Sequence, residues 1–146
     1  MPRVDFYVLP ENSQRERFAC FMTSKARQQG NTIYIHTASR EVAEFLDDLL
    51  WTFKDISFLP HAIAEEDITC NEPVIIGWQD KSPDQYQVMI NLTQDVPVFA
   101  ERFARIIEIV AGKNTDRQQA RNRYRDYRDR GYELHNHTME SDYDNA

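Results

Sequence analysis

The sequence predicts an α/β fold: a single three-layer α/β/α domain with a mostly parallel central sheet and a C-terminal arginine-rich helix. Strand-like and helix-like patterns alternate over roughly the first 50 residues, which is the rhythm of βαβ units. Short, continuous apolar runs follow in the second half, as expected for parallel strands buried on both faces. The last long pattern is helical and carries many arginines, so the closing helix differs from the others.

The first half supplies two strands and two helices. A β-rich run at 4–9 predicts the first strand, and Ser13 and Glu16 have capping-box spacing at the start of the helix that follows. A second β-rich run at 31–38 leads to Ser39, a suitable N-cap for the next helix. The apolar residues of that helix repeat at helical spacing, with Trp51 at the edge of their stripe: Val42, Phe45, Leu46, Leu49, Leu50 and Phe53.

The second half is less regular. The connection 54–72 has no clear period, yet it is too apolar for a disordered segment. Buried-type strands are predicted at 74–78 and 87–92, and 97–103 fits either a short helix or irregular structure. Segment 104–110 fits helix or strand, and its density of β-branched residues favours a last strand.

The closing helix has clear ends and two distinct sides. Thr115 is a good N-cap, and Gly131 suits the left-handed position after the last turn. Ala120 and Tyr127 lie together on one side and are predicted to be buried. Tyr124 therefore stands at the border between the core and the exposed side, where its ring can be held from below while its edge faces a ligand.

The exposed side of this helix carries an arginine stripe. Arg117, Arg121 and Arg128 fall on one stripe with Tyr124, and Arg125 lies at its edge. A charge run is more often a solvated, salt-bridged face, and Arg123, Arg125 and Arg130 do have aspartates at helical spacing. Arg117, Arg121 and Arg128 have no acidic residue three or four positions away in either direction. Unpaired guanidinium groups beside a tyrosine, in a chain of net charge −7, favour an anionic partner.

Length and composition limit the domain organisation, the location and the partners of the protein. A chain of 146 residues forms one domain, which we place at 1–134, followed by an acidic and flexible tail at 135–146. There is no leading apolar run and no membrane-spanning stretch, so a cytoplasmic protein without membrane contact is expected. Cys20 and Cys70 lack CxxC spacing and are expected to be reduced and buried. The net negative charge argues against general coating of nucleic acid.

No catalytic constellation is present in the sequence. The four glycines form neither of the loops that let backbone amides approach phosphate, so no cofactor is expected. His135 and His137 could hold a metal only with a fixed third ligand, and we predict no metal site. His61 has no Ser, Cys or Asp companion in sequence, which favours a structural hydrogen-bonding role.

Motifs spread along the chain together resemble one family. In order, they are Phe6-Tyr7-x-Leu9, Leu50-Trp51, Ser57-Phe58-Leu59-Pro60-His61, Pro73-Val74 with Trp78, and Ala120-Arg121-x-Arg123-Tyr124-x-x-Tyr127-Arg128-x-x-Gly131-Tyr132-x-Leu134. Over 4–134 this order resembles the chi subunit of bacterial DNA polymerase III. The resemblance implies a non-enzymatic accessory subunit of the clamp loader, active in DNA replication.

The resemblance also implies partners and their sites. It implies pairing with the psi subunit, a helicase able to share the psi-facing surface, and binding to the acidic, phenylalanine-ended C-terminal tail of single-stranded DNA-binding protein (SSB). Contact with DNA would be mainly indirect. The implied tail-binding residues are Val110, Arg117, Arg121, Tyr124, Arg125 and Arg128. The implied psi-facing residues are Trp51, Phe58, Leu59, Pro60 and His61.

Two other functions remain open at this stage. An enzyme of nucleotide or nucleic-acid metabolism could use a similar α/β sheet, although the absence of phosphate loops and of an acid/base pair opposes it. Direct binding of single-stranded DNA is the other alternative, with bases stacked on Tyr124 and arginines along the phosphates. The net acidity of the chain disfavours that mode.

Overall fold

A computed structural model describes residues 2–10, 13–52, 61–63, 72–112 and 114–139. The strands are β1 (Arg3–Val8), β2 (Ile33–His36), β3 (His61–Ile63), β4 (Val74–Gly77), β5 (Val88–Asn91), β6 (Arg105–Val110) and β7 (Glu133–Thr138). The helices are α1 (Arg15–Gln28), α2 (Arg40–Thr52) and α3 (Asn114–Asp129), with a short 3₁₀ turn η1 (Ala100–Arg102).

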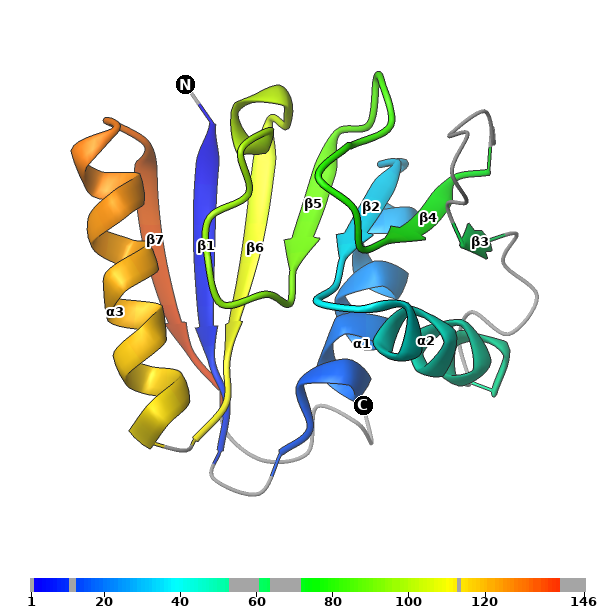
Figure 1. The fold of residues 1–146 in the computed structure, drawn as a ribbon, viewed down its shortest axis with the longest axis horizontal. Coiled ribbons are helices and arrows are strands. Elements are labelled where there is room, and N and C mark those ends of the chain that lie inside the picture. Colours follow the sequence, from blue (N-terminus) through cyan, green and yellow to red (C-terminus); the bar gives the residue numbers. More distant parts are fainter. Residues whose placement is uncertain (1, 11–12, 53–60, 64–71, 113, 140–146) are drawn as a thin grey trace.

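The seven strands form one sheet in the order β3-β4-β2-β5-β6-β1-β7 (Figure 1). Every pairing in the described part of the chain is parallel. The predicted single α/β sheet with a C-terminal helix is therefore confirmed, and the sheet is more uniformly parallel than expected. Strand β6 also resolves the ambiguity at 104–110 in favour of a strand, as predicted.

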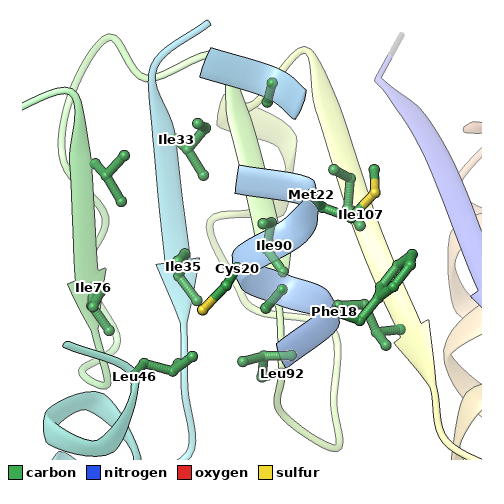
Figure 2. Close-up of a cluster of buried hydrophobic side chains, with 14 of the residues drawn as sticks. Phe18, Cys20, Met22, Ile33, Ile35, Leu46, Ile76, Ile90, Leu92 and Ile107 are labelled. Atoms are coloured by element: carbon green, nitrogen blue, oxygen red, sulfur yellow. The ribbon is translucent and has the colours of Figure 1, made fainter. Parts of the chain in front are cut away.

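The helices form layers on both faces of the sheet. Helices α1 and α2 share one apolar cluster with the sheet, and α3 and η1 share the other. Figure 2 shows α1 lying along the first cluster, where Phe18, Cys20 and Met22 face strand residues such as Ile35, Ile90 and Ile107. Because helices cover both faces, the central strands need apolar residues at successive positions.

The helix ends only partly follow the predicted caps. Helix α1 begins after Gln14 without a side-chain capping bond, so the capping box predicted from Ser13 is wrong. Ser39 does cap α2, since its Oγ accepts the Val42 amide at 3.3 Å. Helix α3 begins at Asn114 rather than after Thr115, and it ends as predicted at a left-handed Gly131 with φ 83°.

The sequence missed two edge strands. Residues 135–138, predicted as the start of a flexible tail, belong to β7, which pairs with β1 along its whole length. The prediction failed because backbone hydrogen bonds hold this polar edge strand, and none of its residues is fully buried. His137 Nε2 donates to the Asp5 carboxylate at 2.9 Å, and its ring stacks on Tyr7. The remaining tail, 140–146, lies outside the described residues.

The other missed strand is β3, inside the connection predicted to lack regular structure. It pairs with β4 at the opposite edge of the sheet from β7. Segment 97–103 contains the turn η1, in line with the short helix considered there. Cys20 is a buried free thiol, whereas Cys70 lies outside the described residues. None of the described helices is long and apolar enough to cross a membrane.

Candidate functional site

A groove of about 430 Å³ lies at the carboxyl ends of β1, β6 and β7, beside the first half of α3. The strand register explains its position, because Val8 is level with both Val110 and Thr138. Alternate strand residues point to the same face, so the ends of the three strands form one floor under the helix. The lining residues are Phe6, Val8, Val110, Arg117, Ala120, Arg121, Tyr124, Asn136 and Thr138.

The floor of the groove is apolar and aromatic. Phe6 is buried, and its ring centroid lies 5.3 Å from that of Tyr124, with the planes tilted by 55°. Tyr124 is itself half-buried, as predicted for a residue at the border of the core. Ala120 is buried and small, so the helix leaves open space above the strand ends at this point.

The rim of the groove is cationic. Arg117 and Arg121 are exposed, and neither forms an ion pair within the described part of the chain. Arg125 is exposed in the same way but does not line the groove. Arg128, expected to be unpaired, lies 3.5 Å from the adjacent Asp129 and is also outside the groove. The structure thus brings Val110, Arg117, Arg121 and Tyr124 together in the groove, and Arg125 and Arg128 lie on the same helix outside its lining.

A buried polar network fixes the helix that carries these arginines. The Glu108 carboxylate accepts from Arg123 Nε at 2.8 Å, from Tyr127 Oη at 2.6 Å and from Asn91 Nδ2 at 2.8 Å. Burial raises the pKa of Glu108, while the Arg123 charge acts in the opposite direction. Burial and the neighbouring Glu108 also raise the pKa of Tyr127. Three donors aimed at one carboxylate make this network the main polar anchor of α3 on the sheet.

Of two ion pairs predicted for Asp126, the structure contains the one with Arg130 and not the one with Arg123. Arg123, for which helical spacing offered Asp126, is buried and bonded to Glu108. Asp126 pairs with Arg130 instead, at 2.8 Å, as the spacing predicted for that arginine. The buried positions predicted for Ala120 and Tyr127 are confirmed. An arginine at a core-facing position was the sequence signal for the network, but its acidic partner lies on a different element.

Of the expected psi-facing residues, the structure describes Trp51, at the end of α2, and His61, at the start of β3. Trp51 is 50% exposed, and its ring lies 4.2 Å from that of His61. His61 is buried and its Nε2 lies 3.3 Å from the Asp47 carbonyl oxygen, in line with a structural hydrogen-bonding role. Phe58, Leu59 and Pro60 lie outside the described residues. Phe45, on another side of α2, is 51% exposed and was not predicted as a surface residue.

Five groove residues were not predicted as site residues, and one of them, Ala120, was predicted only as a buried contact. Phe6 and Val8 alternate on β1 with residues of the opposite face, so a strict period-two reading could have paired them with Val110. Asn136 and Thr138 could not be found, because β7 was not recognised as a strand. Among the described residues, no group of three or more His, Cys, Asp or Glu side chains could hold a metal ion.

Fold and groove together define a class of protein: an all-parallel α/β domain with a ligand-sized groove that has a cationic rim and an apolar floor. The family model described as DNA polymerase III chi subunit, HolC, matches residues 1–135. The chain therefore belongs to the chi-subunit family of DNA polymerase III, and its part in DNA replication is that of a polymerase accessory subunit rather than the catalytic chain.

Curated relatives agree with the family match. The chi subunit of Pseudomonas aeruginosa is 39% identical over 141 residues, covering 95% of this chain and 98% of the relative. The Haemophilus influenzae chi subunit is 32% identical and covers 88% and 92%. The Escherichia coli K12 chi subunit is 29% identical and covers 94% and 99%. Each relative is matched over nearly its full length.

One solved structure from outside the family has a similar fold. The C-terminal domain of S. cerevisiae Dbp5 superposes with a TM-score of 0.64, at 12% sequence identity, over 97% of this chain and 93% of that chain. At this identity the likeness shows a shared α/β architecture and carries no information about ligands.

Proposed function

We propose that this chain links the clamp loader of DNA polymerase III, through the psi subunit, to the C-terminal tail of SSB. The observation that supports the tail contact is the groove itself, in which Arg117 and Arg121, without an ion pair among the described residues, line the same space as Tyr124 and the apolar floor. A ligand that suits this surface carries negative charge and ends in an apolar group. An acidic peptide with a C-terminal phenylalanine has both properties.

In the proposed complex, the terminal phenylalanine ring enters the space over Ala120 and contacts Phe6, Tyr124 and Val110. The terminal carboxylate then lies near Arg117 and Arg121, which can bind it through two parallel N–H donors. Acidic residues further from the peptide's end would reach Arg125 and Arg128, the predicted contacts outside the groove.

The energetics require both parts of the groove. Exposed ion pairs contribute about 0–1 kcal/mol each, so the arginines alone give weak and salt-sensitive attachment. Burial of a phenylalanine side chain contributes about 1.5–3 kcal/mol. The floor therefore supplies selectivity for the phenylalanine end, and the rim supplies attraction and orientation.

The psi contact is proposed for the surface around Trp51, together with Phe58, Leu59, Pro60 and His61. The Trp51 ring is half exposed and rests on the buried His61, so it is a pre-positioned anchor. Large aromatic side chains of this kind dominate interface energetics. We place the protein in the cytoplasm, with a helicase able to compete for the same surface and with DNA contacted mainly through its partners.

Isothermal titration with two synthetic peptides tests the tail contact. One peptide has an acidic cluster followed by a C-terminal phenylalanine, and the other lacks only that phenylalanine. The intact peptide should bind and the shortened one should bind much more weakly. Raising ionic strength from about 0.05 to about 0.5 M shortens the screening length from roughly 14 to roughly 4 Å, and it should weaken the complex without abolishing it.

Two results would count against this function. Equal affinities for the two peptides would mean that the arginine stripe is only an electrostatic surface. If a single-stranded oligonucleotide bound more tightly than the intact peptide at low salt, direct DNA binding would replace the peptide contact.

A further inference from the structure

A second cavity, of about 410 Å³, lies at the carboxyl ends of β2, β4 and β5 and shares no residue with the groove. Strands β2 and β5 are neighbours, but the chain leaves β2 toward β3 and β4 and leaves β5 toward β6. Ligands in open parallel sheets bind at such a switch point, outside the carboxyl ends of the strands. The lining residues are His36, Thr37, Ala38, Trp78, Asp80, Thr93, Gln94, Asp95, Val96, Pro97 and Val98.

His36 presents an unpaired nitrogen to this cavity. The residue is only 6% exposed, and its Nδ1 lies 3.0 Å from the Tyr34 hydroxyl. The same hydroxyl donates to the Lys81 carbonyl oxygen at 3.3 Å, and a carbonyl oxygen can only accept. Tyr34 thereby accepts from the His36 Nδ1–H, which leaves Nε2 as a lone pair without a partner in the described part of the chain.

The position of His36 is fixed on several sides. Its ring meets Phe99 edge-on at 5.0 Å, and Tyr34 stacks on Phe103 with an interplanar angle of 9°. Gly77 leaves room for Tyr34, because a Cβ there would lie 2.5 Å from the hydroxyl oxygen. Burial lowers the pKa of His36 to about 4, so the imidazole is neutral at neutral pH and keeps its acceptor. The acceptor is therefore held rigidly at the cavity wall.

The cavity also carries two unpaired carboxylates. Asp80 and Asp95 both line it, and neither forms an ion pair among the residues that the structure describes. No Lys or Arg lines the cavity, so its formal charge is −2. Trp78 forms part of the wall, and the Arg40 guanidinium, outside the lining, lies 5.6 Å from its ring centroid.

We propose that this cavity binds a guanidinium or ammonium group, with a donor hydrogen on His36 Nε2, the charge facing Asp80 and Asp95, and the aliphatic part against Val96 and Val98. Anions are disfavoured, since both acids line the space and no Lys or Arg side chain belongs to its lining. The cavity is thus opposite in charge to the arginine groove. Its ligand is either a small free cation or an arginine or lysine side chain of a protein.

Titrations followed by NMR distinguish these sources. Agmatine serves as the free cation and the capped tripeptide acetyl-Gly-Arg-Gly-amide as the protein side chain, each added to the full chain. Saturable shifts of the Trp78 indole and His36 ring signals are expected with a dissociation constant of about 1 mM. Tighter binding of the tripeptide assigns the cavity to a protein partner, and tighter binding of agmatine assigns it to a small molecule.

Variants test whether the acids carry the binding. Replacing both carboxylates, by Asp80→Asn and Asp95→Asn together, should weaken binding of the better probe by at least about tenfold. Asp84→Asn is the matched control, since Asp84 is 88% exposed, pairs with Arg102 and lies outside the cavity, and it should change nothing. His36→Phe, with an unchanged melting transition as its folding check, should also lose binding.

Three outcomes would overturn the proposal. The first is the absence of saturable shifts with either probe. The second is unchanged affinity in the doubly substituted Asp80 and Asp95 protein. The third is binding of an anion of similar size, such as AMP, in preference to both cations, because that would assign the opposite ligand charge to the cavity.

Discussion

Helices α2 and α3 cover opposite faces of the same sheet, yet different forces hold them. Helix α2 buries three aliphatic side chains, Ala43, Leu46 and Leu50, in one apolar cluster. Helix α3 buries Ala120 and Tyr127 together with a charged residue, Arg123, that is bonded to Glu108. A helix held by aliphatic side chains must give a broad stripe of its surface to apolar residues, whereas a helix held by a buried ion pair gives up only a few positions. The polar anchor therefore leaves most of α3 free to carry arginines.

The same difference explains where the groove lies. The buried network holds α3 at Arg123 and Tyr127, and Ala120, one turn earlier, is too small to fill the space above the strand ends. A larger residue at that position would close the groove. Helix α2, which packs through aliphatic side chains, exposes two single aromatic side chains, Phe45 and Trp51. One half of the molecule thus offers a groove and the other offers protruding anchors.

The largest expected effect comes from breaking the ionic anchor. Arg123→Ala leaves the buried Glu108 carboxylate without its cation and should lower the free energy of unfolding by about 3–5 kcal/mol. Arg130→Ala, which removes an exposed pair with Asp126, should cost no more than about 1 kcal/mol. Urea unfolding of the two variants checks this. Equal losses would show that the network is not the anchor of α3.

On the α2 side, Trp51→Ala should leave the isolated protein folded and weaken the psi complex by about 2 kcal/mol or more. The matched control is Phe45→Ala, because Phe45 is equally exposed but lies about 120° away around the helix. Melting curves of the free variants and titration against psi from the same organism provide the measurements. A collapsed melting transition for Trp51→Ala would mean that the ring serves the core.

Within the groove, Arg121→Ala should weaken binding of the phenylalanine-ended peptide by up to about 1 kcal/mol, roughly fivefold. Arg125→Ala removes the same charge from the next position, outside the groove, and should have a smaller effect. Isothermal titration of the two variants separates a specific contact from general electrostatic attraction. Identical losses would favour a diffuse charged surface.

The last prediction concerns the buried histidine on the face that α3 also covers, and its size depends on pH. The pKa of His36 is lowered to about 4 by burial, against about 6.5 in an unfolded chain. Between pH 4 and pH 6.5 the unfolded state binds a proton at this histidine and the folded state does not. The free energy of unfolding is therefore highest above about pH 6.5, and it falls toward pH 4 by at most about 1.4 kcal/mol per pH unit. Unfolding of wild type and His36→Phe near pH 7 and pH 5 should show a smaller loss in the variant. An equal loss would assign the acid sensitivity to other groups.

The sequence predicted the elements whose side chains carry a period and missed those held by other means. The arginine helix, its left-handed Gly131 and its buried Ala120 and Tyr127 followed from helical spacing. Strands β3 and β7 were missed because one is very short and the other is a polar edge strand. Their backbone pairing leaves no hydrophobic pattern to read.

The sequence likewise predicted part of the candidate site and missed the rest. Residues on α3 and on β6, such as Arg117, Tyr124 and Val110, could be placed together from helical spacing and the family resemblance. The bond between Arg123 and Glu108 could not, since local spacing offered Asp126 and the true partner lies on β6. Contributions from β7 to the groove, Asn136 and Thr138, depended on a strand that the sequence did not reveal.

The most direct test of the central claim maps the peptide onto the protein by NMR. Backbone amide shifts caused by the phenylalanine-ended peptide should concentrate at the groove, at Val8, Val110, the first half of α3 and Thr138, and should spare α2. Ala120→Leu, which fills the space above the strand ends, should abolish these shifts while the protein stays folded. Shifts centred on α2 or on the cavity at His36, or unchanged shifts in the Ala120→Leu protein, would contradict the account.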